Sequence, residues 1–322
     1  MAAAAMLLIK SEAFADSASY LKYKPVFTIE DSTLGDKLAE FVRLETEDAT
    51  GSFLPSDSIE LINTVIYNAD LYDCGTFSKE ENAYREYKYL VTENKFAVYD
   101  IKDLTQYEGE EYTAKVGDAV FFLNDNKRPL TFGIITGESN GNIVVSCQNY
   151  ESDSLRFIDI KSANQYNVKI IGIIYPTVEE VIFSYLKENF AYTTVTCCGI
   201  ISNIYFESYF DSNALEIGGK GGYGLCQWTD ERRTALISWC EENSLDYTHI
   251  IPQLEFMKFE LKGSEFKPVD SMLRSVSDNA DGAYDAAHAF CYFYLMPQDY
   301  EDVAEDRGEF ASDTVYSAFK FC

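Results

Sequence analysis

One acidic residue, Glu207, stands inside the aromatic segment 203–210, whose sequence is NIYFESYF. An apolar environment disfavours the ionised form of a carboxyl group, so a glutamate placed there holds its proton closer to neutral pH than an exposed one does. Such a protonated carboxyl group can donate its proton to the leaving oxygen of a glycosidic bond. The alternative interpretation is an amphipathic helix whose polar face carries this glutamate. The glycine-rich segment 218–228 downstream favours the chemical interpretation.

Length and charge limit what kind of protein this is. A chain of 322 residues is long for one domain and comfortable for two, and 47% hydrophobic residues suffice for real cores. The formal charge of −27 excludes nucleic acid as an expected partner, because phosphate contacts require clustered Lys and Arg.

Neither the cysteines nor the start of the chain is expected to have a special chemical or targeting role. Eight cysteines are too sparse for a small disulfide scaffold and show no C-x-x-C metal spacing, so we expect Cys197 and Cys198 to be buried free thiols. With only two histidines, neither a metal site nor another cofactor is expected. The apolar run 1–9 lacks the leading positive charge of a signal peptide, and no segment reaches the roughly 20 apolar residues of a membrane span.

The pattern of the chain changes at Pro176. The β-rich apolar run 168–175 precedes this proline, and the sequence TVEE at 177–180 is a capping box that starts a helix. We therefore expect an N-terminal segment at 1–30, a first domain at 31–175 and a second domain at 176–322, with an α+β fold class for the whole chain.

The two domains differ in their expected elements. The first is expected to be α+β, with helices at 57–69 and 78–90 followed by a small antiparallel sheet or barrel, in which Asn140-Gly141 predicts a tight hairpin. Its predicted strands are 119–123, 131–136, 143–147 and 168–175. The second is expected to be mainly helical. Its predicted helices are 177–190, 193–207, 230–243, 248–262, 269–276, 281–295 and 311–320.

Three segments of the second domain resemble the phage tail lysozymes, which are lysozyme-like domains of virion proteins. These segments are 204–214 (IYFESYFDSNA), 222–229 (GYGLCQWT) and Arg232-Arg233, and the resemblance runs from about Val178 to Tyr316. It implies that Glu207 is the catalytic acid and protonates the leaving oxygen between N-acetylmuramic acid and N-acetylglucosamine in peptidoglycan.

The same resemblance implies substrate contacts in the glycine-rich segment, at Tyr223, Gly224, Gln227 and Trp228. Glycines there permit tight turns and a close approach of substrate to the backbone. Trp228 is expected to stack on a sugar face, and Gln227 to bind an N-acetyl group or position water. The structural alternative places Trp228 in the core and uses Gln227 to cap a strand.

The second carboxylate is expected to be Glu216, nine residues beyond Glu207, a separation similar to that in phage-type lysozymes. Asp211 and Asp230 compete for this role, although Asp211 is expected to brace its turn and Asp230 to start a helix. If Glu216 lies too far away, Glu207 acts alone as in a lytic transglycosylase, where the sugar's own hydroxyl closes an anhydro ring. The separation of the two carboxyl groups distinguishes these routes.

Four further polar residues have weaker assignments. Arg232 and Arg233 open a helix, where positive charge is unfavourable, so we expect them to grip Glu216 or a peptide carboxylate, with two solvated charges as the alternative. His249 and His288 stand beside aromatic residues in expected helices and are interpreted as structural.

The first domain resembles the CHAP and NlpC-type cysteine peptidases and amidases, which have a papain-like fold. The matching segments are 73–77 (DCGTF), 116–122 (VGDAVFF) and 131–137 (TFGIITG), and Asn149 falls near the family's final polar residue. These enzymes have a histidine where Thr131 stands, and the first domain contains none, so the Cys74 thiol lacks the base that takes its proton. We expect a degenerate, non-catalytic site at Cys74, Thr131 and Asn149, in a domain that binds peptidoglycan peptide or docks onto a particle. A peptidase with another base is the alternative.

These observations predict a peptidoglycan hydrolase of the phage tail, made in the host cytoplasm and carried on the virion to act on the bacterial cell wall at infection. Bacterial peptidoglycan and other tail proteins are the expected partners. Delivery by a tail suits a chain of charge −27, which anionic envelopes repel. The alternatives are a structural tail component with both enzymatic folds inactive, and a bifunctional hydrolase.

Overall fold

The computed structural model describes residues 33–35, 37–38, 67, 70, 83–92, 98–101, 117–139, 142–148, 155–159, 167–173, 175–216, 221–298 and 300–322. These residues form two compact units, which we call the N-terminal unit, ending at Pro176, and the C-terminal unit, beginning at Thr177. The predicted segment 1–30 lies outside the described residues, as does the predicted helix 57–69 apart from Tyr67.

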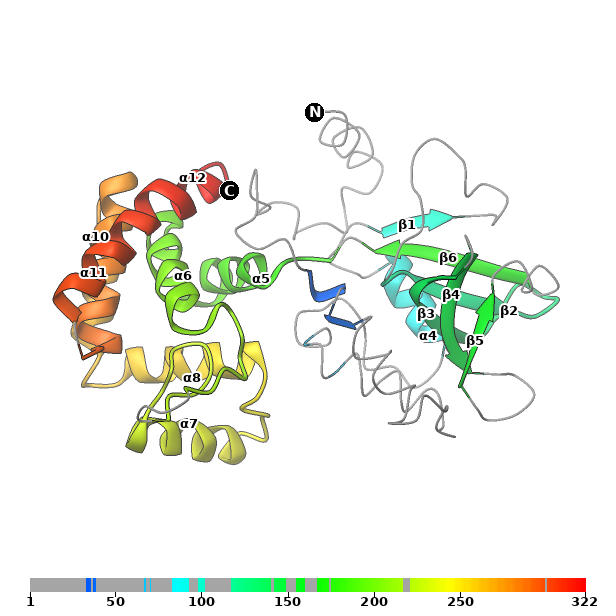
Figure 1. Cartoon of the computed structure of the whole chain (residues 1–322), viewed down its shortest axis with the longest axis horizontal. Helices are drawn as coiled ribbons and strands as arrows, with labels where there is room; N and C mark the ends of the chain where they lie inside the picture. The colour runs from blue at the N-terminus through cyan, green and yellow to red at the C-terminus, as the bar shows by residue number, and fades with distance from the viewer. Residues whose placement is uncertain are drawn as a thin grey trace. The chain divides into compact units, whose positions relative to one another are not determined.

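The N-terminal unit, as far as it is described, contains an antiparallel sheet and the helix α4 (Ala83–Thr92) (Figure 1). The strands are β1 (Val98–Ile101), β2 (Ala119–Leu123), β3 (Pro129–Ser139), β4 (Asn142–Gln148), β5 (Leu155–Asp159) and β6 (Asn167–Ile173). Their order across the sheet is β1-β6-β2-β3-β4-β5, and every neighbouring pair is antiparallel. The four predicted strands are therefore confirmed as β2, β3, β4 and β6, whereas β1 and β5 were not predicted.

Aromatic packing holds this sheet to its helix. Phe121 of β2 stands opposite Phe132 of β3, and their rings stack with centroids 5.3 Å apart. Tyr87 of α4 places its ring edge on Phe121, so one β2 side chain joins strand and helix. Ser139 pairs with Asn142, which closes the β3–β4 hairpin that Asn140-Gly141 predicted. The papain-like identity of this unit stays a prediction.

The C-terminal unit is mainly helical, as predicted (Figure 1). Its helices are α5 (Val178–Tyr185), α6 (Thr194–Ser208), α7 (Asp230–Glu242), α8 (Ile250–Lys262), α9 (Lys267–Leu273), α10 (Ala280–Phe290), α11 (Tyr300–Phe310) and α12 (Tyr316–Phe319). Short π-helical turns at Leu186–Phe190, Cys291–Leu295 and Ala311–Val315 extend α5, α10 and α11. The predicted capping box is confirmed at the start of α5, where Thr177 and Glu180 exchange side-chain to backbone hydrogen bonds.

Helix α6 is the centre of this unit because it is apolar on nearly every side. Its residues from Val195 to Ile204 are all buried, and a helix of this composition requires neighbours on all faces. Helix α10 approaches most closely at Gly199, where the backbone of Ala287 fills the space that a side chain would occupy. The buried amide of Asn203 donates to the carbonyl oxygens of Gly199 and Ala287, at 2.9 and 3.0 Å, and so fixes the two helices in register.

The prediction was wrong about the end of the chain. The last helix was expected at 311–320, but helical structure begins at Tyr300 with α11. Residues 300–310 are rich in acids and offer few apolar side chains at helical spacing, so periodicity alone does not predict them as helix. Packing against α6 and α10 nevertheless stabilises α11.

Two further predictions concern thiols and membranes. Cys197 and Cys198 are buried free thiols, as predicted, and burial raises the pKa of both. Among the helices that the structure describes, none has both the length and the apolar character of a membrane-crossing helix.

The close approach of α6 and α10 predicts that Gly199→Ala destabilises the protein. A Cβ atom at this position would lie 2.5 Å from the backbone nitrogen of Ala287, so the helices must separate. We expect a loss of about 1–2 kcal/mol in the free energy of unfolding, measured by urea denaturation, even though Ala is the better helix former.

Gly308→Ala in α11 is the matched control. Its added Cβ would meet only the ring of Tyr284, 2.5 Å away, which is a half-buried side chain able to shift. The gain in helix propensity then offsets the contact, and stability should change by less than about 0.5 kcal/mol. Equal losses in the two variants would contradict this account of the α6–α10 contact.

Candidate functional site

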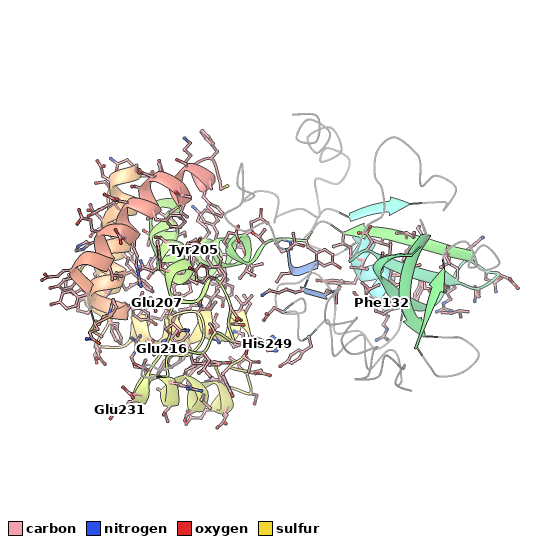
Figure 2. All side chains as sticks on the ribbon, viewed as in Figure 1. Phe132, Tyr205, Glu207, Glu216, Glu231 and His249 are labelled. Carbon is pink, nitrogen blue, oxygen red and sulfur yellow. The ribbon has the colours of Figure 1, made fainter. Side chains whose placement is uncertain are left out.

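Glu207 lies in the last turn of α6, where the central helix reaches the surface. Its side chain is only 14% exposed. The helix ends directly after it, because Tyr209 takes the left-handed conformation (φ 50°) and donates its N–H to the carbonyl oxygen of Tyr205. Figure 2 shows Glu207 between Tyr205 and Glu216 in the middle of the C-terminal unit. The carboxyl group is thus shielded but within reach of the surface.

Arg307 of α11 is the ion-pair partner of Glu207, and sequence analysis missed it. Its Nη1 lies 2.7 Å from Oε1 of Glu207 and also donates to Oδ1 of Asn203, at 3.0 Å. The guanidinium side chain is 7% exposed, and the hydroxyl of Ser202 donates to the Arg307 carbonyl oxygen at 2.7 Å. Ser202, Asn203 and Glu207 therefore form a row on α6 that binds one arginine of α11.

Opposing effects act on the proton affinity of Glu207. Burial raises the pKa of its carboxyl group above the ordinary value of 4.5, and the charge of Glu216 adds to this rise. The charge and the hydrogen bond of Arg307 oppose it, but burial dominates and the pKa remains raised. The raised pKa agrees in direction with the predicted proton donor, whose catalytic role stays a prediction, and the adjacent arginine pairs with the carboxylate.

Glu216 is the second carboxylate of the site region, and its neighbours hold it in place. It is exposed, and its Oε2 accepts the N–H of Gly222 at 3.2 Å while its own N–H donates to the Gly222 carbonyl oxygen at 2.9 Å. The two competing acids occupy structural positions. Asp211 accepts the N–H of Asn213 and so braces its turn, and Asp230 is the first residue of α7.

Gln253 of α8 supports the glycine-rich loop through hydrogen bonds. Sequence analysis did not identify this residue either. This buried amide accepts the N–H of Leu225 at 2.8 Å and donates to the carbonyl oxygens of Ser212 and Tyr247, both at 2.7 Å. Gly224 (φ 72°) rests directly on it, because a Cβ there would lie 2.5 Å from Gln253 Oε1. The missing side chain of Gly224 therefore leaves room for the buried amide of Gln253.

Gln227 and Tyr223 also make internal contacts. Nε2 of Gln227 donates to the carbonyl oxygens of Ala214 and Gly224, at 3.2 and 2.9 Å, so this nitrogen is already occupied within the loop. The ring of Tyr223 is 8% exposed, its hydroxyl donates to Asn213, and burial raises its pKa to about 12. Substrate contacts of these two residues remain predictions.

The expected sugar-stacking role of Trp228 is wrong. Its side chain is 1% exposed, so neither face of the indole is available to a sugar. The ring packs edge-on against Phe256, and Nε1 donates to Oε2 of Glu260 at 2.9 Å. Trp228 is a core residue, which was the structural alternative.

The two arginines have internal partners other than Glu216, and the expected contact with a peptide carboxylate stays a prediction. Arg232 binds Glu260 of α8 through two hydrogen bonds of 2.8 and 2.9 Å and not Glu216. Arg233 donates to the carbonyl oxygen of Gly221 and lies over the ring of Tyr223. Arg233 therefore braces the loop from α7, whereas Arg232 joins α7 to α8.

The remaining predicted residues divide into described and undescribed ones. His249 is buried at the start of α8, and His288 stacks between Tyr284 and Tyr292, so both have structural surroundings. Thr131 belongs to β3, whereas Cys74 and Asn149 lie outside the described residues. In the parts of the chain that the structure describes, no cluster of three His, Cys, Asp or Glu side chains is suited to a metal ion.

Residues 177–319 match the family model of the phage tail lysozymes. The match covers most of the C-terminal unit and supports the predicted resemblance of this unit to the phage tail lysozymes. It covers fewer than half of the residues and does not extend to the N-terminal unit. A search of curated proteins gave no match.

The contact between Gly224 and Gln253 predicts that Gly224→Ala is destabilising. The variant combines an unfavourable left-handed conformation with a clash against a buried amide. We expect a loss of about 2–4 kcal/mol, measured by urea denaturation.

Gly221→Ala supplies the control, because Gly221 has nearly the same φ of 74° but only Arg233 Nη1 near its added Cβ, at 3.6 Å. Its loss should be about 1 kcal/mol, the conformational part alone. A Gly224→Ala variant no less stable than Gly221→Ala would show that Gln253 does not support the loop.

Proposed function

We propose that the C-terminal unit cleaves the bond between N-acetylmuramic acid and N-acetylglucosamine in bacterial peptidoglycan, with Glu207 as general acid. The observation that carries this proposal is the shielded carboxyl group of Glu207, whose raised pKa keeps it protonated at a higher pH than an ordinary glutamate. The match of this unit to the phage tail lysozymes supports the same substrate.

In this mechanism, Glu207 gives its proton to the departing sugar oxygen as the glycosidic bond breaks. The carboxylate that remains is paired with Arg307, which stabilises the negative charge. The sugar ring develops positive charge in the transition state. Glu216, whose charge acts on Glu207, would stabilise that charge or activate water. The participation of Glu216 favours hydrolysis over the route in which Glu207 acts alone as a lytic transglycosylase.

The biological setting follows from the family and the charge. As part of a phage tail, the protein would reach the wall on the virion and open it locally at infection. Attachment to a tail removes the need for electrostatic attraction, which a chain of charge −27 cannot obtain from an anionic envelope. The N-terminal unit, residues 31–175, would bind wall peptide or dock onto other tail proteins, without peptidase chemistry at Cys74.

Replacement of the acid tests the proposed reaction. Glu207→Gln keeps the size of the side chain but cannot donate a carboxyl proton, so the rate of glycan cleavage should fall roughly 100- to 10,000-fold. The measurement is mass spectrometry of digested peptidoglycan, quantifying the released fragments. Glu231→Gln, the same chemical change at an exposed position in the first turn of α7, should cleave at the wild-type rate.

The chemical ends of the fragments separate the alternatives. Reducing ends agree with hydrolysis, whereas anhydro ends would assign the transglycosylase route. Cleavage that survives Glu207→Gln would overturn the assignment of the acid. Intact glycan with the wild-type protein would favour a structural tail component.

The ion pair predicts how activity depends on pH. A general acid works below its pKa, so kcat/KM should fall as pH rises through the pKa of Glu207, which lies above 4.5. Because Arg307 lowers that pKa, Arg307→Met should move this alkaline limb to higher pH. A pH–rate profile measures the shift.

Two variants control for the loss of a buried charge. Arg307→Lys keeps a positive charge, so its alkaline limb should stay closer to the wild-type position. Arg274→Met removes an arginine that is paired with Asp270 on α9, and should leave the profile unchanged. If Arg307→Met unfolds, the pKa of Glu207 is compared between Arg307→Lys and the wild type, by NMR titration of the Glu207 carboxyl carbon. An alkaline limb that moves to lower pH without Arg307 would contradict the role of the pair.

A further inference from the structure

Two large aromatic side chains beside Glu207 are exposed. Phe206 and Tyr209, on either side of the acid in the chain, are 42% and 69% exposed. Together with Tyr205 and Phe310, which they contact, they form a surface that we call the aromatic ledge. Exposed aromatic clusters of this kind mark binding sites more often than chance placement on a surface.

The aromatic ledge is ordered by contacts among its own rings. Tyr205 stacks on Phe310 of α11, with centroids 5.0 Å apart and an interplanar angle of 18°. Phe206 meets Phe310 edge-on at 5.4 Å, and Tyr209 meets Tyr205 edge-on at 5.1 Å. These contacts fix the rings before any ligand binds, which lowers the entropic cost of binding.

The ledge and the acid share the same two helices. Phe310 lies one turn beyond Arg307 on α11, Phe206 directly precedes Glu207 on α6, and Tyr209 is the residue that ends α6. The ring of Phe206 lies 5.9 Å from the guanidinium carbon of Arg307, whose Nη1 lies 2.7 Å from Oε1 of Glu207. The ledge therefore borders the ion pair of the acid.

We propose that the aromatic ledge is the surface on which a pyranose ring of the glycan strand stacks, with Tyr209 as the principal contact. This proposal rests on the proposed function. The apolar C–H face of a pyranose fits an aromatic ring, and the contact needs no opposite charges. It therefore suits a strongly acidic chain that binds an anionic polymer. The ledge also takes the role that the buried Trp228 cannot have.

Removal of the Tyr209 ring tests the ledge. With soluble, peptide-free glycan strands as substrate, Tyr209→Ala should raise KM roughly tenfold and leave kcat within about twofold of wild type. Tyr209→Phe, which keeps the ring, should retain the wild-type KM. Phe259→Ala removes a comparably exposed ring, 54% exposed on α8, and should have no effect.

A binding experiment gives an independent readout. The uncleaved strand bound to Glu207→Gln should show saturation transfer from the aromatic protons to the sugar ring protons in NMR. That transfer should fall by more than half in the Glu207→Gln/Tyr209→Ala double variant. Phe206→Ala serves as a second variant, read by KM alone, because its ring lies 5.9 Å from the guanidinium of Arg307 and its loss can also affect the acid.

The outcomes distinguish this inference from the proposed function. If wild type cleaves the strands but Tyr209→Ala has an unchanged KM, the ledge does not bind glycan and faces another tail protein or solvent. A fall in kcat with unchanged KM would likewise overturn it. If wild type cleaves no strand, the proposed function fails first, and saturation transfer to an uncleaved strand still decides whether the ledge binds sugar.

Discussion

The pairing of Glu207 with Arg307 depends on the packing of the whole C-terminal unit. The glutamate comes from α6 and the arginine from α11, and Asn203 and Ser202 of α6 bind the same arginine through its side chain and its carbonyl oxygen. Asn203 in turn bonds to α10, through the carbonyl oxygen of Ala287. One network of buried polar groups thus fixes three helices and sets the environment of the acid, and each unmet hydrogen bond within it would be costly.

The loop that carries Glu216 is supported in a different way. Side chains of α8 hold it by hydrogen bonds: Gln253 accepts the N–H of Leu225, and Glu260 accepts the indole N–H of Trp228. Glu260 accepts hydrogen bonds from Trp228, Arg232 and the hydroxyl of Tyr294. Glu207 is therefore held by the packing of a helix, whereas Glu216 lies in a loop that is held by hydrogen bonds.

The sequence predicted the features that depend on residues close together in the chain. The helices with apolar periodicity, the capping box at Thr177 and the position of Glu207 all follow from residues near in sequence. Arg307, Gln253 and Glu260 do not, because each acts on a segment tens of residues away. The one available signal was that Arg307 is the only cation in the acidic stretch 300–319. Trp228 was misjudged because a tryptophan beside a glycine-rich turn is equally suited to the core and to a ligand.

The distance in sequence between the members of the ion pair has a consequence for biosynthesis. Arg307 follows Glu207 by 100 positions in the chain, so α11 leaves the ribosome well after the glutamate. While the chain is still growing, the glutamate has neither its arginine nor the helix that shields it. The acid acquires its final environment only after α11 has been synthesised, so a truncated polypeptide that stops before α11 carries the carboxyl group without its counter-ion.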